Sequence, residues 1–438
     1  MASNGGDSKP LMLGVAGFGT VGSGLARILE ENREHIQLRT GRDIRIKSVL
    51  VRDPARKRSV PFPAGAKICS NMSELVNDPD IDVLVELMGG IEAPKKLVMA
   101  ALNAGKHVVT ANKALLAEEG EKIFALAAQK GLALGYEASV CGAIPIVQTM
   151  QEGLAANRVI TLSGILNGTS NYILSAMTSE GADFASALKK AQELGFAEAD
   201  PTLDIEGFDA AHKLTLLIRL AWGVNYPFKK LQVRGITQVA PEDIQFAREF
   251  GYNIKLLGHA RMEKGKIEAG VFPTLVPKNY LLAKVGHSYN AVRIEGNAAG
   301  SIFLHGLGAG DKPTGSAVAA DIMNIARRAR PNNLGYALNS LPPAEIMPTE
   351  EAASSYYFRL MVVDRPGALR DISGAMADHG ISIAQALQKG QKDVVPLMFM
   401  THETTSQSVE AALKQIKGTG MLTAEPVFYR VMPPSGQA

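Results

Sequence analysis

The N-terminal third of the chain alternates short apolar runs with segments whose apolar residues recur at helical spacing. The apolar runs are residues 11–16, 44–51, 81–90, 107–110 and 131–140. Apolar strands that alternate with helices form a parallel sheet with helices on both faces. The pattern therefore predicts an α/β fold, with a Rossmann-type doubly wound parallel sheet over residues 11–145.

The middle of the chain has a different pattern. Residues 209–222 are apolar on nearly every side, which predicts a helix buried in a core. The preceding residues, 195–207, contain a proline and glycines and indicate a loop. Residues 258–302 favour strands joined by turns, a sheet suited to contact between subunits. We expect an α+β substrate-binding and dimerisation domain over 146–307, in a homodimer or homotetramer.

The C-terminal part is predicted to be a small unit of its own. Between residues 356 and 434 the pattern gives strand, helix, strand, strand, helix, strand, which is the ferredoxin-like plan. Residues 331–355 are rich in proline and indicate a linker that separates this tail from the rest. Residues 1–10 are polar and indicate a disordered leader.

Composition narrows the class of partners. The 438 residues include 46 basic and 43 acidic side chains, interspersed without a basic stripe, so we expect neither nucleic acid nor a membrane as a partner. No apolar run reaches the ~18 residues of a spanning helix. Cys69 and Cys141 are the only cysteines, too few for a disulfide framework. Together with the absence of a signal pattern, this predicts a cytoplasmic protein.

The first strand leads into the glycine turn of a dinucleotide-binding site. The turn is GFGTVG, which comprises Gly17, Phe18, Gly19, Thr20, Val21 and Gly22. The first glycine allows the turn, the second lets a pyrophosphate approach the backbone, and the third lets helix and strand pack closely. The motif alone is weak, but a strand before it and an amphipathic helix after it strengthen the prediction.

The end of the second strand bears on the choice of cofactor. An acidic residue there suits the ribose hydroxyls of NAD, whereas an arginine suits the 2′-phosphate of NADP. Arg52 and Asp53 offer both, and Arg56, Lys57 and Arg58 follow. We expect NADP, with NAD as the alternative. At least two of the three following cations are expected to lie in a solvated loop.

Lysines and carboxylates are the remaining candidates for chemistry. Lys113 follows the strand at 107–110, at the edge where ligands of such sheets bind. Asp209 and Lys213 are four residues apart on the buried helix, behind the acidic residues of 195–207. This cluster could simply complement the helix dipole, or it could bind a ligand that carries positive charge. Burial lowers the pKa of a lysine, as does a second cation nearby, and suits it to acid–base work.

Four segments resemble one family, homoserine dehydrogenase. They are TANK at 110–113, GYEASVCGAIPI at 135–146, GILNGTSNYIL at 164–174 and GFAEADPTLDIEGFDAAHK at 195–213. The resemblance covers nearly the whole chain. It implies the reversible NAD(P)-dependent interconversion of L-homoserine and L-aspartate 4-semialdehyde, in the biosynthesis of threonine, methionine and isoleucine.

The resemblance also implies roles for individual residues. Lys213 is the proton donor and acceptor, Lys113 helps to hold substrate and cofactor, and the amino-acid site contains Glu198, Asp204, Asp209 and Thr169. We assign the substrate ammonium group to Glu198 and a catalytic role to Asp209 beside the two lysines. A return of residues 308–330 to the nucleotide domain places Gly308 and Gly310 beside the cofactor.

A sodium ion held by backbone carbonyls is a further implication of the resemblance. The matching positions are Glu137, Val140, Gly142 and Ile144. Cys141 departs from the small residue expected between them. A buried, inert cysteine is the better interpretation of this difference than a redox-sensitive one.

The tail resembles the ACT domain, a sensor of small molecules often attached to enzymes of amino-acid biosynthesis. The segments DRPGAL at 364–369 and HGISI at 379–383 carry this resemblance. Asp364, Gly367, Ala368 and Leu369 are the candidate regulatory residues, and L-threonine is the expected effector. The alternative is an assembly module without a ligand.

A non-catalytic sensor of nucleotide and amino-acid levels is the competing hypothesis for the whole chain. Lys113, Lys213 and Glu198 discriminate the two, because a pure sensor needs neither paired lysines nor a carboxylate cluster. These residues favour the enzyme.

Overall fold

The computed structural model of the chain describes residues 9–58, 60–327, 331, 333–338, 340–348, 351–388 and 393–432. The chain divides into two units. The first comprises Met1–Val159, Ala211–Leu231 and Tyr289–Ala344, and the second comprises Ile160–Ala210, Gln232–Ser288 and Glu345–Ala438. The domain boundaries expected from the sequence stay a prediction.

The first unit contains a parallel sheet of six strands. These are β1 (Leu11–Ala16), β2 (Ile44–Leu50), β3 (Lys67–Cys69), β4 (Val83–Glu86), β5 (His107–Thr110) and β6 (Leu134–Gly135). Their order is β3-β2-β1-β4-β5-β6. The order reverses between β1 and β4, and ligands of such sheets bind beyond the carboxyl ends of the strands at this point.

Helices of the first unit join the strands or follow the sheet. They are α1 (Thr20–Glu31), α2 (Arg33–Thr40), α3 (Met72–Val76), α4 (Glu92–Asn103), α5 (Lys113–Lys130), α6 (Ile146–Gln148) and α13 (Asp311–Ala326). Short turns of other helix types are η1 (Glu137–Ser139), η2 (Thr149–Gly153) and η3 (Phe228–Lys230). Strands β11 (Tyr289–Gly296) and β12 (Gly300–Leu307) form an antiparallel hairpin.

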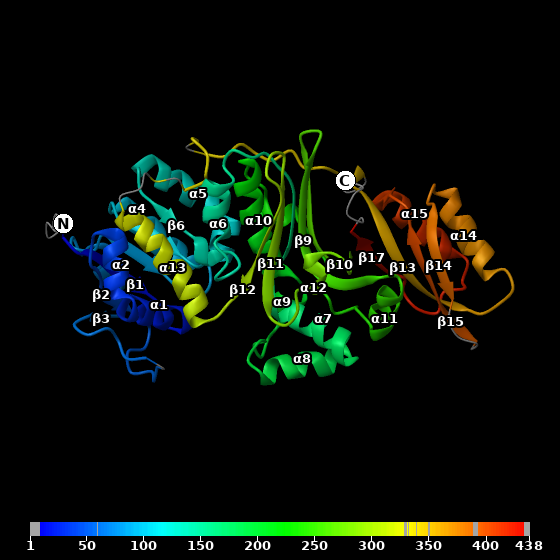
Figure 1. Ribbon diagram of the computed structural model, residues 1–438, viewed down its shortest axis with the longest axis horizontal. Helices are drawn as coiled ribbons and strands as arrows, with labels where there is room; N and C mark the ends of the chain where they lie inside the picture. The colour runs from blue at the N-terminus through cyan, green and yellow to red at the C-terminus, as the bar shows by residue number, and fades with distance from the viewer. Residues whose placement is uncertain are drawn as a thin grey trace. The chain divides into compact units, whose positions relative to one another are not determined.

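The α13 helix, near residue 320, completes the apolar core around α1, near the start of the chain. α13 lies beside α1 (Figure 1), and a Cβ added at Gly24 would come within 2.1 Å of the carbonyl oxygen of Asp311. Leu25 and Leu29 of α1 share one apolar cluster with Val318 and Ile322 of α13. The two helices can approach this closely only because glycine lies at their contact.

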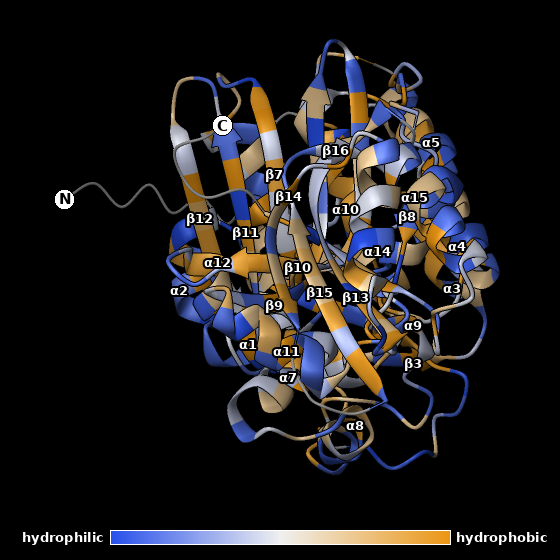
Figure 2. Ribbon diagram, turned by 90° about the vertical axis from the view of Figure 1, so that its right-hand side faces the viewer, coloured by the Kyte–Doolittle hydropathy of each residue, from blue (hydrophilic) through white to orange (hydrophobic). Residues whose placement is uncertain are grey.

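The second unit contains a mixed sheet in the order β7-β9-β10-β17-β13-β15-β14. The strands are β7 (Val159–Ile165), β9 (Tyr252–Glu263), β10 (Lys266–Pro277), β13 (Ala353–Val363), β14 (Ile383–Gln388), β15 (Val394–Thr401) and β17 (Val427–Val431). The short strands β8 (Gln232–Val233) and β16 (Thr404–Thr405) pair at its side. Figure 2 shows β10 and β15 largely in hydrophobic colours, as expected for strands that contribute to a core.

Helices of the second unit are α7 (Gly168–Glu180), α8 (Phe184–Glu193), α9 (Thr202–Ile205), α11 (Pro241–Glu249), α12 (Leu281–Lys284), α14 (Ala368–Asp378) and α15 (Ser406–Gly418). The α10 helix (Phe208–Trp222) has its first residues in the second unit and the rest in the first. Its position matches the buried helix predicted at 209–222.

The tail has the predicted order of strands and helices, but it is not separated from the rest of its unit. β17 pairs in parallel with β10, through Thr274 with Arg430 and Leu275 with Val431. Arg359 of β13 forms an ion pair of 2.6 Å with Asp243 of α11. The tail's edge strand therefore continues the neighbouring sheet of the same unit, and the linker expected over 331–355 stays a prediction.

Candidate active site and nucleotide site

The glycine turn after β1 has the backbone geometry that a pyrophosphate requires. Gly17 has φ +98°, and a Cβ there would lie 2.5 Å from the carbonyl oxygen of Leu87. A Cβ at Gly22 would lie 2.6 Å from the carbonyl oxygen of Gly17, whereas one at Gly19 would meet nothing within 4 Å. α1 has neither a capping side chain nor an acidic residue in its first turn. Its first N–H groups therefore suit an anion.

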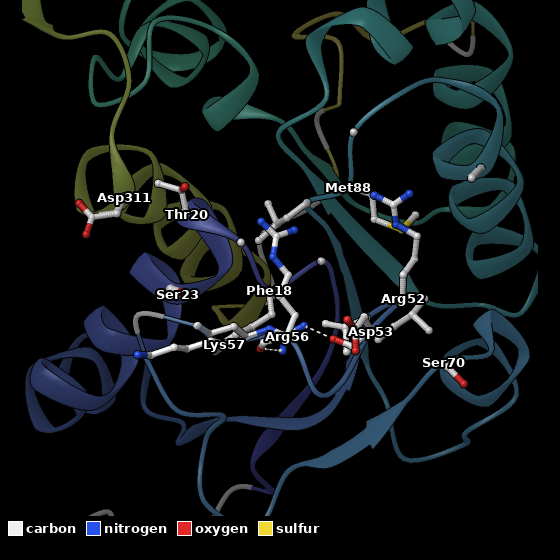
Figure 3. Close-up of a pocket in the computed structure, with 18 of the residues that line it drawn as sticks. Phe18, Thr20, Ser23, Arg52, Asp53, Arg56, Lys57, Ser70, Met88 and Asp311 are labelled. Atoms are coloured by element: carbon white, nitrogen blue, oxygen red, sulfur yellow. Dashed lines mark hydrogen bonds between the residues drawn. The ribbon is translucent and has the colours of Figure 1, made fainter. Parts of the chain in front are cut away.

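A cavity of about 1190 Å³ opens at this turn, at the carboxyl ends of the strands. Figure 3 shows Thr20 and Ser23 of α1 on one side of it and Arg52, Asp53 and Ser70 on the other. Its lining includes five cations and two carboxylates: Arg27, Arg52, Arg56, Lys57, Arg58, Asp53 and Asp311. The excess of cations suits a ligand with several phosphates.

Within the basic loop, Arg58 has a structural role. It donates hydrogen bonds to the carbonyl oxygens of Asp53, Pro54 and Arg56 and lies 4.8 Å from the ring centre of Phe62. Arg58 thus holds the loop that presents Arg52. Arg56, Lys57 and Arg58 all line the cavity, and the expectation that at least two of them lie in a solvated loop stays a prediction.

Some residues predicted to bind the cofactor lie outside the cavity lining. Of the described residues, those are Val21, Gly22, Lys113, Gly308 and Gly310. Phe18 lines the cavity with little exposed surface and packs against Phe62. Gly310 has φ +126° and precedes α13, and a Cβ at Gly308 would lie 2.3 Å from the side chain of Asn290. Close packing accounts for the glycine at 308, and the positive φ accounts for the glycine at 310.

A hydrogen-bond network that the sequence did not reveal joins the ends of β4 and β5. Glu86 is fully buried and accepts hydrogen bonds from Thr110 and from the N–H of Met88. Burial raises the pKa of its carboxyl to about 7. Asn112 caps α5 by accepting a hydrogen bond from the N–H of Leu115, and donates to the carbonyl of Gly90. Asn112 precedes Lys113, which is half-buried at the start of α5.

The carbonyl loop expected to hold sodium follows β6. Cys141 and Gly142 both have φ +56°, and a Cβ at Gly142 would lie 2.5 Å from the carbonyl oxygen of Gly308. The carbonyl of Glu137 accepts from the N–H of Val140, and that of Ile144 accepts from Ile146. Each carbonyl oxygen has a second lone pair, so these bonds are compatible with a cation. In the described residues, no group of three or more His, Cys, Asp or Glu side chains is placed to bind a metal.

The side chain of Glu137 has a different partner from its carbonyl. Its carboxylate accepts hydrogen bonds from the N–H groups of Val147 and Gln148. Burial raises the pKa of this carboxyl to about 7. Glu137 therefore fixes the backbone after the loop. Cys141 is buried, as the inert interpretation expects.

In the second unit, Asn167 brings two of the predicted carboxylates together. Its side-chain N–H₂ donates to Asp204 at 2.6 Å and to Asp209 at 2.7 Å. Its carbonyl oxygen accepts from the N–H of Ser170 and so caps α7. Two sequence segments with the same family resemblance, 164–174 and 195–213, thus meet here. Sequence reasoning missed Asn167, although an asparagine before a helix is a capping signal.

Two further predicted substrate residues lie near this network. Thr169 is buried and donates to the carbonyl of Phe196 at 2.6 Å. Glu198 is exposed in the following loop, where Gln192 donates to its carbonyl oxygen. The structure thus leaves the carboxylate of Glu198 accessible.

The predicted proton-transfer residues lie on α10. Asp209 and Lys213 are one turn apart, and both are buried, with exposed fractions of 6% and 7%. Asp209 falls in the second unit and Lys213 in the first. The two residues predicted to take part in proton transfer are therefore both shielded from solvent.

The loop with the candidate regulatory residues of the tail leads into α14. The helix begins at Ala368, after Gly367 at φ +91°. The N–H of Ala368 donates to the carbonyl of Arg365, and its side chain is buried in the tail's core. Asp364 and Leu369 are exposed. Arg365 and Pro366 are exposed as well, so most of the loop 364–369 is accessible from solvent.

The sheet order, the glycine turn and the basic cavity define the class of Rossmann-type NAD(P)-binding proteins. Family models of "Homoserine dehydrogenase, NAD binding domain" and "Homoserine dehydrogenase" match residues 17–137 and 145–323, and an ACT domain model matches 356–420. The chain belongs to the homoserine dehydrogenase family.

Individual relatives agree with this membership. The chain is 43% identical to a homoserine dehydrogenase of Neisseria gonorrhoeae over 93% of this chain and 95% of that protein. It is 41% identical to one of Pseudomonas aeruginosa over 97% and 99%. The crystal structure of a homoserine dehydrogenase from Thiobacillus denitrificans superposes with a TM-score of 0.92 at 43% identity, over 97% of this chain and 98% of that one.

Family membership confirms the predicted resemblance and the fold class. The protein is an NAD(P)-dependent oxidoreductase with a C-terminal ACT domain, so the hypothesis of a non-catalytic sensor is wrong. Among the described helices, none has the length and apolarity needed to cross a membrane.

Proposed function

We propose that the protein catalyses the reversible interconversion of L-homoserine and L-aspartate 4-semialdehyde, with NADP as the preferred cofactor. The observation that carries the proposal is the buried Lys213, one helical turn beyond a carboxylate that Asn167 holds in place. The direct test is a spectrophotometric assay of L-homoserine with NADP and with NAD in parallel. Absence of turnover with both cofactors would contradict the proposal.

The residues of the chain fit specific tasks in this reaction. The nicotinamide, when bound, supplies the hydride acceptor or donor. Lys213 takes the hydroxyl proton of homoserine and returns it in the reverse direction. Glu198 binds the substrate ammonium group, because an exposed carboxylate can meet an incoming cation. Lys113 holds substrate and cofactor at the start of α5.

The remaining substrate contacts are proposed on the same basis. Asp204 and Asp209 orient the substrate, and the side-chain amide of Asn167 donates a hydrogen bond to each of them. Thr169 fixes the loop that carries Glu198, through its hydrogen bond to the carbonyl of Phe196. The carbonyls of Glu137, Val140, Gly142 and Ile144 hold sodium. We further propose a homodimer or homotetramer.

Replacing Arg52 by alanine should weaken NADP binding while leaving NAD binding nearly unchanged. Arg52 lines the cavity, and an arginine at this position can pair with the 2′-phosphate, which NAD lacks. A charge-assisted contact of this kind contributes about 1.5–3 kcal/mol, so the dissociation constant for NADP should rise by about one to two orders of magnitude. Fluorescence titration of both reduced cofactors measures this.

Lys57→Ala is the matched control, because Lys57 lines the same cavity from the same loop. If the dissociation constant for NADP rises equally in both variants, the overall positive charge of the loop explains the preference for NADP over NAD. If Arg52→Ala weakens NADP and NAD alike, Arg52 is a structural residue.

The ACT domain is proposed to bind L-threonine at the loop 364–369. Asp364 can bind the ammonium group, and the backbone after Gly367 can meet the carboxylate. We expect threonine inhibition that is not competitive with homoserine, since coupling between distinct sites is typically about 1–3 kcal/mol.

Calorimetry with the full chain should detect threonine binding, and Asp364→Asn should weaken it without changing turnover in the absence of threonine. Asp378→Asn is the control, because Asp378 is exposed at the far end of α14, the helix that follows the loop. Absence of threonine binding to the unmodified chain would make the tail an assembly module.

A further inference from the structure

Arg219 is a buried cation that the proposed chemistry does not use. Its exposed fraction is 5%, and it lies on α10, six residues after Lys213. One terminal nitrogen donates to the carbonyl oxygen of Leu116, and the other donates to that of Ala117 at 3.0 Å. In the described part of the chain Arg219 forms no ion pair, and its Nε has no hydrogen-bond partner. The hydrogen bonds of Arg219 to other elements are therefore made to the backbone at Leu116 and Ala117.

That stretch is the beginning of α5. Lys113 is the first residue of α5, and Leu116 and Ala117 follow it by about one turn. Carbonyls at these positions already accept from N–H groups of the next turn, and each oxygen has a second lone pair for the guanidinium. The planar guanidinium presents its two donors in a fixed geometry. Arg219 therefore connects the helix that carries Lys213 with the helix that begins at Lys113.

The sequence of α5 leaves room for this contact. A Cβ added at Gly120 would lie 2.7 Å from a terminal nitrogen of Arg219. Glycine in a helix interior makes the helix less stable than alanine would. The least favourable residue for the α5 helix thus lies where the guanidinium contacts it. The absence of a side chain at Gly120 therefore makes room for the guanidinium that donates to Leu116 and Ala117.

Stability alone does not explain such a residue. Burying a charge is unfavourable unless it is well compensated, and Arg219 has only the electrostatic attraction of Glu121 and Tyr136 to offset its burial. Apolar side chains of similar volume often stabilise a core better than buried ions do. Burial lowers the pKa of Arg219 to about 10, which reflects the same cost. A directional contact supplies what an apolar side chain cannot, namely a fixed position of α5 along α10.

We propose that Arg219, accommodated by Gly120, is a positioning residue that sets Lys113 relative to Lys213 for the proposed reaction. The inference rests on the proposed roles of the two lysines. Other contacts join the same segments: His212 lies 3.5 Å from Glu118, and Asn225, after α10, donates to Glu121 at 2.7 Å. Of these contacts, those of Arg219 are made to the backbone of α5, at two consecutive carbonyls, whereas those of His212 and Asn225 are made to side chains.

The test measures kcat, KM for homoserine, the dissociation constant of NADPH and the midpoint of thermal unfolding for Arg219→Met, Arg219→Lys and Gly120→Ala. Arg219→Met should lower kcat by about 10²-fold, which is the effect of a misplacement of roughly 1 Å. Its dissociation constant for NADPH should stay within about twofold of the unmodified value, because the glycine turn and the basic cavity bind the phosphates and no residue of α5 lines that cavity. The contact proposed between Lys113 and the cofactor is a small part of this affinity. Arg219→Lys keeps N–H donors at the same place and should recover part of kcat.

Gly120→Ala reaches the same contact from the other side and changes no charge. It should lower kcat in the same direction as Arg219→Met, by crowding the guanidinium. Asn225→Ala is the matched control, since it removes a different contact with α5 that is more exposed, and its kcat should be unchanged.

The outcomes separate this inference from the proposed function. Normal kcat in folded Arg219→Met overturns the inference, as does an equal loss in Arg219→Lys and Arg219→Met. If Arg219→Met does not fold, normal kcat in Gly120→Ala overturns it, and reduced kcat with unchanged NADPH binding supports it. Absence of homoserine turnover in the unmodified chain, or normal turnover in Lys213→Met, contradicts the proposed function itself.

Discussion

Replacing Lys213 by methionine should lower kcat by about 10²–10⁴-fold, the usual effect of losing a general acid or base. Methionine retains an unbranched apolar side chain of similar length, so the buried position on α10 stays filled. The dissociation constant of NADPH should not change, because the glycine turn and the basic cavity are formed by other elements. Steady-state kinetics and fluorescence titration give the two quantities.

Lys189→Met is a suitable control for this variant, because Lys189 is exposed on α8. It should have normal kcat and normal stability. A Lys213→Met protein with nearly unchanged kcat would show that another group accepts the hydroxyl proton.

Replacing Arg359 by methionine should lower the free energy of unfolding by about 3–5 kcal/mol, the cost of leaving one member of a buried ion pair without its partner. Asp243 is fully buried and lies 2.6 Å from Arg359. It also accepts hydrogen bonds from the hydroxyl groups of Tyr357 and Tyr429, but neither carries a positive charge. Urea unfolding measures the loss.

A second substitution distinguishes the lost charge pair from lost packing. Asp243→Asn removes the buried charge, so the double variant with Arg359→Met should be more stable than Arg359→Met alone. Arg365→Met is the control, because Arg365 is exposed and lies 3.8 Å from Asp371. If Arg359→Met costs no more than this control, the pair does not fasten the tail.

The ion pairs between the tail and the rest of its unit mean that deletion of the tail would also affect the stability of that unit. Glu268 of β10 is buried and forms ion pairs with Arg430 of β17 and with Arg261 of β9. Removal of residues from 354 onward would take Arg359 and Arg430 away and leave Asp243 and the edge of β10 uncovered. Such a deletion cannot report on regulation alone, and point substitutions such as Asp364→Asn are the appropriate test.

Features set by neighbouring residues could be predicted from the sequence. The glycine turn and the strands around it follow from local rules, because a tight turn needs glycine and a buried strand needs an apolar run. The α10 helix was predicted because its apolar residues cover nearly every face. The α2 helix, Arg33–Thr40, was missed because it is short and charged and has a single buried residue.

Contacts between distant residues could not be predicted in this way. The bridge from Asn167 to Asp204 and Asp209 depends on how α7 meets the loop before α10, and nothing local to residue 167 specifies it. The docking of the tail was missed for the same reason. Proline-rich sequence indicates the absence of helix and strand, but it does not indicate whether the following strand will pair with an earlier sheet.

The contact between α1 and α13 has a consequence for how the protein is made. A ribosome adds about 5–20 residues per second, so α13 emerges roughly 15–60 s after α1. During that interval Leu25 and Leu29 lack the side chains of Val318 and Ile322 that complete their cluster. The nascent nucleotide-binding region therefore exposes apolar surface until three-quarters of the chain has been translated, and it is a natural substrate for chaperones that bind growing polypeptides.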